Sequence, residues 1–378
     1  MPKFVNVLDF REAARRRLPR IAFDYLEPGA EDGITSRRNR AVFERLAFQP
    51  SMLSDVAEVD LSTSILGHPC RLPLVIGPTG FAGLFWPQAD RILAESAAQA
   101  GIPFVLSTAS TTSIEQIARC GGGMTPHWFQ LYLLNDRAAT TAMVQRAAEA
   151  GYDGIVLTVD TACAGKRDAS IRHGSRLPLK LDAQKLLDFA SHPHWSWQMA
   201  RYGQPRLANF PYERNKPFVM EKHLKKSVGW DDVRWLRSIW PGKLILKGIM
   251  NVDEAAQAVQ LGVDGIVVSN HGGRQLDGAL SPVSVLESIV ERVGQQLTVM
   301  VDSGFRRGSD VVKALALGAK AVWLGRATLY GVAAVGDTGP QQVLSIFADE
   351  MTRAMKLSGR RNVQALDTSV VRWMETGE

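Results

Sequence analysis

Residues 265–278 read GIVVSNHGGRQLDG, a short apolar run followed at once by a glycine-rich polar loop. The run 265–268 predicts a buried strand, and the loop places His271 and Arg274 three residues apart at its end. Gly272 and Gly273 carry no side chain, so the backbone can turn sharply there and approach a ligand closely. An imidazole beside a guanidinium suits an acidic ligand. Taken alone, such a motif also fits a surface loop with a solvated His and Arg.

The segments on either side repeat this pattern. Further apolar runs of strand length alternate with longer helical runs, several of which end at a glycine. The predicted strands are Leu72–Ile76, Pro103–Leu106, His127–Leu131, Gly154–Val159, Lys243–Leu246, Gly265–Val268, Leu297–Val301 and Ala321–Leu324. The helices predicted between them include Gln88–Gln99, Arg137–Ala150, Val252–Leu261 and Asp310–Leu317.

Repeated strand and helix units predict an α/β fold, the closed (β/α)8 TIM barrel. A doubly wound open sheet is the alternative, but that fold normally carries a Gly-x-Gly-x-x-Gly turn after its first strand, and the chain has none there. Residues 1–50 read as a helical N-terminal extension that precedes the first strand. The length of 378 residues and the hydrophobic content of 46% suit a single barrel domain over residues 1–378.

The composition of the chain limits the class of ligand and the cellular compartment that we expect. The 44 basic and 38 acidic residues leave a formal net charge of +6, which fits an anionic ligand or an anionic lipid surface and does not indicate nucleic acid. Three cysteines without a C-x-x-C pair predict a reducing compartment, with neither a disulfide framework nor a metal site. Residues 1–10 lack the apolar core of a signal peptide, and we expect no membrane-spanning helix.

Each predicted strand ends in a polar or glycine-containing segment. In order these are Pro78-Thr79-Gly80, Ser107-Thr108, Gln130-Leu131-Tyr132, Thr158 with Asp160, Lys247, Ser269 with His271 and Arg274, Asp302-Ser303-Gly304-Phe305-Arg306, and Gly325-Arg326. The carboxyl ends of barrel strands open on one face, so these segments predict the mouth of a single pocket. The last two lie where barrels commonly bind phosphate, beside a helix start and arginine side chains.

One long segment interrupts the repeat. About 50 residues separate Arg172 from His223, more than a loop between a strand and a helix needs, which predicts a functional insertion over residues 177–222. The insertion carries Trp195, Trp197 and Tyr202 among basic side chains. Aromatic rings and cations together suit a lipid headgroup layer, so we expect a membrane-contact loop. A packed lid or a subunit contact is the alternative.

The motif SNHGGRQLD at residues 269–277 and the order of the strand-end segments resemble the FMN-dependent α-hydroxy-acid oxidase and dehydrogenase family over nearly the whole chain. The resemblance implies an enzyme that binds FMN and oxidises an (S)-2-hydroxy acid to the 2-keto acid. Pro78-Thr79-Gly80 and residues 191–210 are most similar to the mandelate-oxidising members, which implies oxidation of (S)-mandelate to benzoylformate. Gly80 stands where the family more often has alanine, and the missing methyl leaves room for an aryl substrate.

The resemblance also implies roles on the substrate side of the pocket. Arg167 and Arg274 correspond to a clamp that holds the substrate carboxylate through paired guanidinium contacts. Tyr25 and Tyr132 correspond to two phenols that donate hydrogen bonds to substrate oxygens, and Tyr132 is counted with the catalytic residues.

His271 corresponds to the catalytic base, and Asp160 to the carboxylate that orients it and stabilises its protonated form. Lys247 corresponds to the cation beside the pyrimidine edge of the flavin, where it stabilises the reduced ring. The implied flavin contacts are Pro78, Thr79, Gly80, Ser107, Gln130, Thr158, Lys247, Ser269, Asp302, Ser303, Gly304, Phe305, Arg306, Gly325 and Arg326.

The long insertion anchors the membrane-associated members of the family. The resemblance therefore implies a cytoplasmic enzyme whose residues 177–222 attach it peripherally to the anionic inner face of the cell membrane. It also implies a quinone or another membrane electron acceptor, and a homo-oligomer. The alternatives are an L-lactate dehydrogenase or a glycolate or 2-hydroxy-acid oxidase that uses O2, a flavin-free phosphate-binding isomerase or aldolase, and a non-enzymatic lipid-binding barrel.

Overall fold

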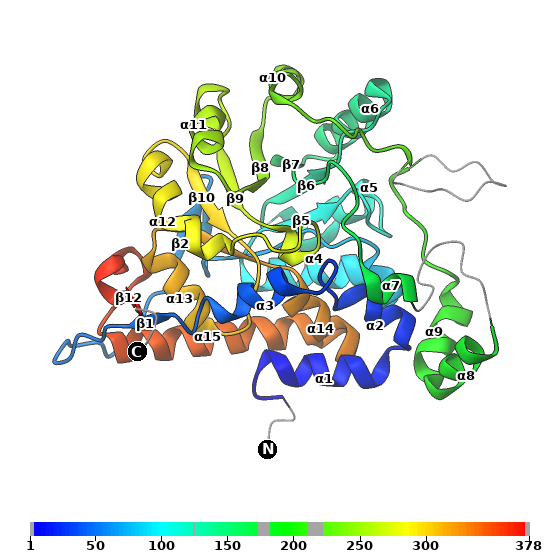
Figure 1. Ribbon diagram of the computed structural model, residues 1–378, viewed down its shortest axis with the longest axis horizontal. Helices are drawn as coiled ribbons and strands as arrows, with labels where there is room; N and C mark the ends of the chain where they lie inside the picture. The colour runs from blue at the N-terminus through cyan, green and yellow to red at the C-terminus, as the bar shows by residue number, and fades with distance from the viewer. Residues whose placement is uncertain (1–3, 124, 173–181, 211–221, 375–378) are drawn as a thin grey trace.

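The computed structural model describes residues 4–123, 125–172, 182–210 and 222–374 (Figure 1). Eight parallel strands close into a barrel, in which β9 pairs with β10 and β11 pairs with β4. The strands are β4 (Leu74–Ile76), β5 (Phe104–Ser107), β6 (His127–Leu131), β7 (Gly154–Thr158), β8 (Lys243–Ile249), β9 (Gly265–Val268), β10 (Thr298–Val301) and β11 (Ala321–Leu324). Each overlaps a predicted strand, and the closed order excludes the open sheet.

The inside of the barrel is a packed core. Alternate strand residues face inward and form a buried cluster of their own, in which the rings of Trp128 and Trp323 lie 5.8 Å apart. The hairpin of β2 (Thr63–Ile65) and β3 (His68–Cys70) contributes Ile65 to this cluster and so closes one end of the barrel. The open end, where the polar loops gather, is therefore the end that can hold a ligand.

Helices cover the outside of the barrel with their apolar faces inward. They are α4 (Ala89–Ala100), α5 (Ile114–Ala118), α6 (Arg137–Glu149), α10 (Trp230–Ile239), α11 (Val252–Gln260), α12 (Pro282–Val293), α13 (Gly308–Ala316), α14 (Arg326–Val335) and α15 (Gly339–Ser358). Short 3₁₀ helices are η1 (Ala82–Leu84), η2 (Cys120–Gly123), η4 (His271–Gly273), η5 (Gly336–Thr338), η6 (Val363–Ala365) and η7 (Thr368–Val370). The four helices predicted from periodicity are confirmed as α4, α6, α11 and α13.

The N-terminal extension is helical, as predicted. It comprises α1 (Val7–Arg17), α2 (Arg20–Leu26) and α3 (Ile34–Ala41), and α1 packs against α14. The Asn6 side chain caps α1, with Asp9 completing a capping box. The extension is also tied to the far end of the described chain, because β1 (Leu46–Phe48) pairs antiparallel with β12 (Val371–Trp373).

The insertion lies between β7 and β8, as predicted, and its helices α8 (Ala183–Ser191) and α9 (Pro193–Tyr202) stand beside the barrel at the lower right of Figure 1. It follows α7 (Asp168–Arg172), and residues 177–181 and 211–221 of it lie outside the described residues. Trp195 is buried, and its Nε1 donates to Leu84 O at 2.8 Å, so this ring packs on the barrel and cannot contact lipid. Among the described residues, no helix is long and apolar enough to cross a bilayer.

Candidate active site

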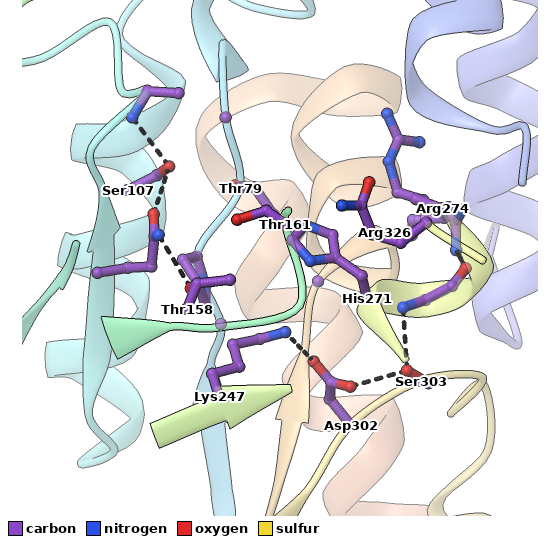
Figure 2. Close-up of a pocket in the computed structure, with 18 of the residues that line it drawn as sticks. Thr79, Ser107, Thr158, Thr161, Lys247, His271, Arg274, Asp302, Ser303 and Arg326 are labelled. Atoms are coloured by element: carbon purple, nitrogen blue, oxygen red, sulfur yellow. Dashed lines mark hydrogen bonds and ion pairs between the residues drawn. The ribbon is translucent and has the colours of Figure 1, made fainter. Parts of the chain in front are cut away.

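A cavity of about 730 Å³ opens at the carboxyl ends of the barrel strands (Figure 2). The predicted catalytic and substrate-side residues that line it are Tyr25, Tyr132, Arg167, Lys247, His271 and Arg274. The predicted flavin contacts that line it are Pro78, Thr79, Gly80, Ser107, Gln130, Thr158, Lys247, Asp302, Ser303, Gly304, Phe305, Arg306, Gly325 and Arg326. Asp160 and Ser269 lie directly behind lining residues, to which they are hydrogen-bonded. The structure therefore brings all the predicted positions together.

His271 and Asp160 form a hydrogen-bonded pair in the cavity wall. His271 follows β9 with a φ of 59°, a left-handed conformation, and its ring faces the cavity in Figure 2. Its Nδ1 lies 3.0 Å from Asp160 Oδ1, which leaves Nε2 for a ligand. Burial raises the pKa of Asp160, but His271 and Lys247 outweigh this effect and hold that pKa below its ordinary value. An ionised carboxylate in contact with the imidazole stabilises its protonated form.

Gly248 makes room for Asp160. It follows Lys247 with a φ of 108°, and a Cβ added to it would lie 2.7 Å from Asp160 Cβ and Cγ. Any larger residue would therefore strain the backbone and push the carboxylate away from the imidazole. Sequence reasoning missed Gly248, because a glycine near the end of a strand does not reveal which side chain needs the space.

Lys247 is a buried cation beneath the cavity. Its Nζ lies 2.9 Å from Asp302 Oδ2 and donates to Ser269 Oγ at 2.8 Å. Burial lowers the pKa of Lys247, but Asp302 and Asp160 outweigh this effect and raise it above its ordinary value, so the ammonium stays charged. Figure 2 shows the ammonium and Asp302 side by side, with Asp302 in turn bonded to Ser303 Oγ at 2.7 Å.

Two arginines, Arg167 and Arg274, and Tyr25 lie together in the cavity wall. The guanidinium carbons of Arg167 and Arg274 lie 5.4 Å and 5.7 Å from the ring centre of Tyr25. Arg274 also donates to the backbone oxygen of Tyr25 at 2.9 Å, so helix α2 fixes its position. Burial, then the nearby Arg326 and Arg167, lower the pKa of Arg274 below its ordinary value. This excess of positive charge favours an anionic ligand.

Gln275 joins the loop after β7 to the loop after β9. Its Nε2 donates to Asp160 O at 2.9 Å and to Cys163 O at 3.0 Å, and its Oε1 accepts from Gly165 N at 3.0 Å. These bonds bring Arg167, which continues the first loop, next to the second. Gln275 lies within the motif, but its role was not predicted, because the pairing partner of a loop amide depends on the fold.

A polar amide and hydroxyl network forms the wall next to β5 and β6. Gln130 Nε2 donates to Thr158 Oγ1 at 3.0 Å, and Gln130 Oε1 accepts from Ser107 Oγ at 3.1 Å. Gly80 lies against this wall, and a Cβ on it would come 3.2 Å from Ala109 Cβ. The closeness of Ala109 explains why an added methyl there would alter the shape of the cavity. Burial raises the pKa of the neighbouring Tyr132, so its phenol stays a hydrogen-bond donor.

The opposite end of the cavity has the chemistry of a phosphate site. Helix α14 begins at Arg326, directly after Gly325, so its first backbone N–H groups and two arginines, Arg306 and Arg326, lie at this end. Arg326 is held in place by bonds to Gly272 O at 2.8 Å and Pro28 O at 3.2 Å. Phe305 lines the cavity but is buried, and its ring packs 5.0 Å from that of Phe43, so it supports the loop.

The donor set fits FMN along its whole length. Amide and hydroxyl groups of Gln130 and Thr158 suit the polar edge of a flavin ring, and the Lys247 ammonium suits a ring that gains negative charge on reduction. The corner at Gly325 and Arg326 suits the phosphate. The cavity also contains residues that sequence reasoning did not single out, which are Leu26, Gly77, Phe85, Ala109, Thr161, Ala162, Cys163, Ala164, Lys222, Leu224, Lys225, Lys226, Gln275, Trp323, Leu324 and Leu329.

A closed (β/α)8 barrel with a His–Asp pair, two neighbouring arginines and a helix start at the far end of the cavity fits the class of flavin-dependent oxidoreductases that act on acidic substrates. The chain belongs to the FMN-dependent dehydrogenase family, whose model matches residues 14–373. It is therefore an FMN enzyme that oxidises the CH–OH group of a 2-hydroxy acid. This assignment removes the flavin-free isomerase and the non-enzymatic barrel from the alternatives.

Individual relatives span almost the whole chain. The chain is 44% identical to (S)-mandelate dehydrogenase of Pseudomonas putida over 367 residues, covering 96% of this chain and 92% of the relative. It is 41% identical to L-lactate oxidase of a Nostoc species, covering 97% of each. The crystal structure of the monotopic membrane protein (S)-mandelate dehydrogenase superposes with a TM-score of 0.95 at 43% identity, covering 98% of this chain and 100% of that one.

Proposed function

We propose that the chain oxidises (S)-mandelate or a closely similar aryl 2-hydroxy acid to the 2-keto acid. The observation that carries the proposal is the placement of the His271–Asp160 pair and the Arg167–Arg274 pair on one cavity. Gly80 and the space it leaves beside Ala109 support an aryl group, because a methyl at this position would be in tight contact. The similarity to (S)-mandelate dehydrogenase supports the same substrate.

We assign the arginines and phenols to substrate binding. The Arg167 and Arg274 guanidiniums would bind the carboxylate, and their fork geometry would fix the orientation of the substrate in the cavity. The phenols of Tyr25 and Tyr132 donate hydrogen bonds to substrate oxygens. Because Arg274 is held by helix α2, the N-terminal extension takes part in substrate positioning.

His271 Nε2 accepts a proton from the substrate, and Asp160 stabilises the imidazolium that results. When bound, FMN would accept the two electrons and the second proton that leave the 2-hydroxy acid. Lys247 is charged and buried next to Asp302, where it stabilises negative charge on a neighbouring ring. Gln130, Ser107 and Thr158 hold the ring edge. Arg306, Gly325 and Arg326, which follow β10 and β11, would hold the phosphate.

The second candidate is an L-lactate dehydrogenase or a lactate or glycolate oxidase that uses O2. The observation that favours it is the 41% identity to L-lactate oxidase, close to the identity with the mandelate enzyme. A panel of (S)-mandelate, L-lactate and glycolate, assayed in parallel with O2 and with a quinone analogue, separates the two. We expect the highest kcat/KM for (S)-mandelate with the quinone analogue. A higher kcat/KM for L-lactate, or rapid turnover with O2, would favour the second candidate.

We also propose that the insertion attaches the enzyme to the cytoplasmic face of the cell membrane, where a quinone accepts the electrons. Leu187, Trp197 and Tyr202 are 72%, 57% and 56% exposed, and the Arg201 guanidinium lies 5.2 Å from the Trp197 ring centre. Exposed rings and alkyl chains beside a cation suit the headgroup layer. The monotopic relative supports the same attachment.

We further propose that the chain forms a homo-oligomer, as members of the family often do. Light scattering of the purified protein would test this proposal.

A further inference from the structure

A second cavity, of about 680 Å³, lies between α4, α9 and the start of α15. We call it the α4–α9 groove. Its lining combines aromatic rings with hydrogen-bond acceptors, among them Trp86, Glu95, Trp197, Gln198, Tyr202 and Gln341. The groove shares no lining residue with the active-site cavity, and it reaches the exposed side of α9 at Trp197 and Tyr202.

Two amide oxygens of the groove lack partners. Gln198 is only 6% exposed, and its Oε1 is buried without a hydrogen-bond partner among the described residues. Gln341 Oε1, contributed by α15, is in the same state. Buried acceptors almost always accept a hydrogen bond in folded proteins. An acceptor that loses its hydrogen bonds to water and gains no partner costs free energy of folding. An occupant of this groove must therefore bring hydrogen-bond donors.

The acidic side chains of the groove favour a positively charged hydrogen-bond donor. The carboxylates of Glu95 and Asp337 line it, and Arg91, the one arginine in its lining, is already bonded to Glu95 at 2.8 Å. The rings of Trp86, Trp197 and Tyr202 already lie beside the guanidiniums of Arg17 and Arg201, so the carboxylates and the amide oxygens are the acceptors for a further cation. A primary ammonium meets both demands, since it carries positive charge and three N–H donors. A quaternary ammonium has the charge but no donor for the amide oxygens.

Two further guanidiniums flank the same rings. Arg17 lies 4.0 Å from the Trp86 ring centre, and Arg201 lies 5.2 Å from that of Trp197. Guanidiniums at the edge of an acceptor-lined groove suit a phosphate joined to the ammonium. The neighbouring helix α8 exposes Leu186 and Leu187, which suit acyl chains. The groove and the side chains beside it thus offer partners for the ammonium, the phosphate and the acyl chains of a phospholipid.

We propose that the α4–α9 groove binds the phosphoethanolamine headgroup of a membrane phospholipid. The proposal rests on the membrane contact proposed above and deepens it. The exposed side chains of α8 and α9 bring the enzyme to the lipid surface, and the groove makes the contact selective for a headgroup that donates N–H bonds. The active site is not involved, so turnover with a soluble electron acceptor is independent of the groove.

The test compares two sets of vesicles that contain the same fraction of phosphatidylglycerol, with phosphatidylethanolamine or phosphatidylcholine as the other lipid. We expect the FMN-loaded full chain to cosediment about 3- to 10-fold more tightly with the first set, the effect of one or two added hydrogen bonds. Soluble glycerophosphoethanolamine should remove this difference, and glycerophosphocholine should not. Because curvature differs between the two vesicle sets, this competition decides whether the groove itself is responsible. Equal binding to both sets overturns the headgroup proposal but leaves the membrane contact standing, whereas binding to neither overturns both.

Gln198→Leu removes the amide at nearly constant size, and Glu95→Gln removes a carboxylate from α4 without touching α9. Each should abolish the preference for phosphatidylethanolamine and leave dye-linked turnover unchanged. Gln295→Leu, at an exposed position outside the groove, is the matched control and should keep the preference. If the preference persists in both groove variants, the proposal is wrong. A change in the oligomeric mass of either variant in solution would show that a second copy of the chain covers the groove, which also overturns the proposal.

Discussion

Replacing Asp160 by Asn tests the assignment of the His–Asp pair. The substitution keeps the size of the side chain and its ability to accept from His271 Nδ1, which now lies 3.0 Å from Asp160 Oδ1, but it removes the negative charge. The imidazolium formed during the reaction then loses its counter-charge in a partly buried setting. Substrate binding should change little, because the carboxylate clamp is formed by Arg167 and Arg274 on another part of the wall.

The size of the effect follows from the geometry. A hydrogen bond of 3.0 Å places the centres of the two charged groups about 4 Å apart, where unit charges interact by about 4 kcal/mol at an effective dielectric constant of about 20. Loss of that stabilisation in the transition state slows the chemical step by about 10³-fold. The Asp–Asn change in a hydrolase triad, where the acid has the same task, costs about 10⁴-fold, so the estimate is conservative.

The assay is anaerobic stopped-flow reduction of the bound flavin, followed by its visible absorbance at saturating substrate. Flavin content and thermal unfolding serve as controls, because a variant that loses FMN or unfolds says nothing about charge. We expect a roughly 10³-fold slower reduction with a KM within about threefold of the parent. A reduction rate within tenfold of the parent would refute the role assigned to Asp160.

Three further predictions follow from particular contacts. Gly80→Ala should lower kcat/KM for (S)-mandelate about tenfold relative to L-lactate, because its new Cβ lies 3.2 Å from Ala109 Cβ and tightens the cavity; unchanged substrate ratios and unchanged O2 reactivity would remove residue 80 from substrate selection. The double variant Lys222→Gln, Lys226→Gln should have a severalfold lower kcat/KM at low salt, with a weaker salt dependence and an unchanged kcat. Both lysines line the cavity and are exposed, so they attract the anionic substrate through long-range electrostatics. A salt profile parallel to that of the parent would contradict this electrostatic attraction. The Tm difference between the parent and Asp160→Asn should shrink below about pH 4. The pKa of Asp160 is lowered in the folded parent, so the ionised carboxylate stabilises the parent, and this stabilisation is lost as the pH falls through that pKa. Parallel Tm curves would mean that folding does not stabilise the carboxylate.

The barrel was largely predictable because its signals are local. A strand such as Gly265–Val268 is buried on all sides and reads as an unbroken apolar run, so its bounds were found to the residue. The three-residue strands β1 and β12 were missed, because they are too short for a hydrophobic period and pair only through contacts distant in sequence. Their existence depends on the completed fold.

The site was predictable where chemistry resides in one residue type, and less so where it depends on packing. His271 and Lys247 were found from their positions at strand ends, whereas Gly248 and Gln275 act by making space and by joining loops, which only neighbouring atoms reveal. Trp195 shows the same limit. The composition of the insertion suggested that Trp195 contacts lipid, but its ring is buried and donates a hydrogen bond to the backbone of Leu84. Trp197 and Tyr202 are the rings exposed at the surface.

The most direct measurement is the visible spectrum of the purified yellow protein during anaerobic titration with (S)-mandelate. We expect the flavin bands to bleach at one equivalent of substrate, and a His271→Asn variant with a full complement of FMN to keep its colour over the same time. A parent protein that keeps its colour with (S)-mandelate, L-lactate and glycolate alike, or a variant that bleaches as fast as the parent, would contradict it.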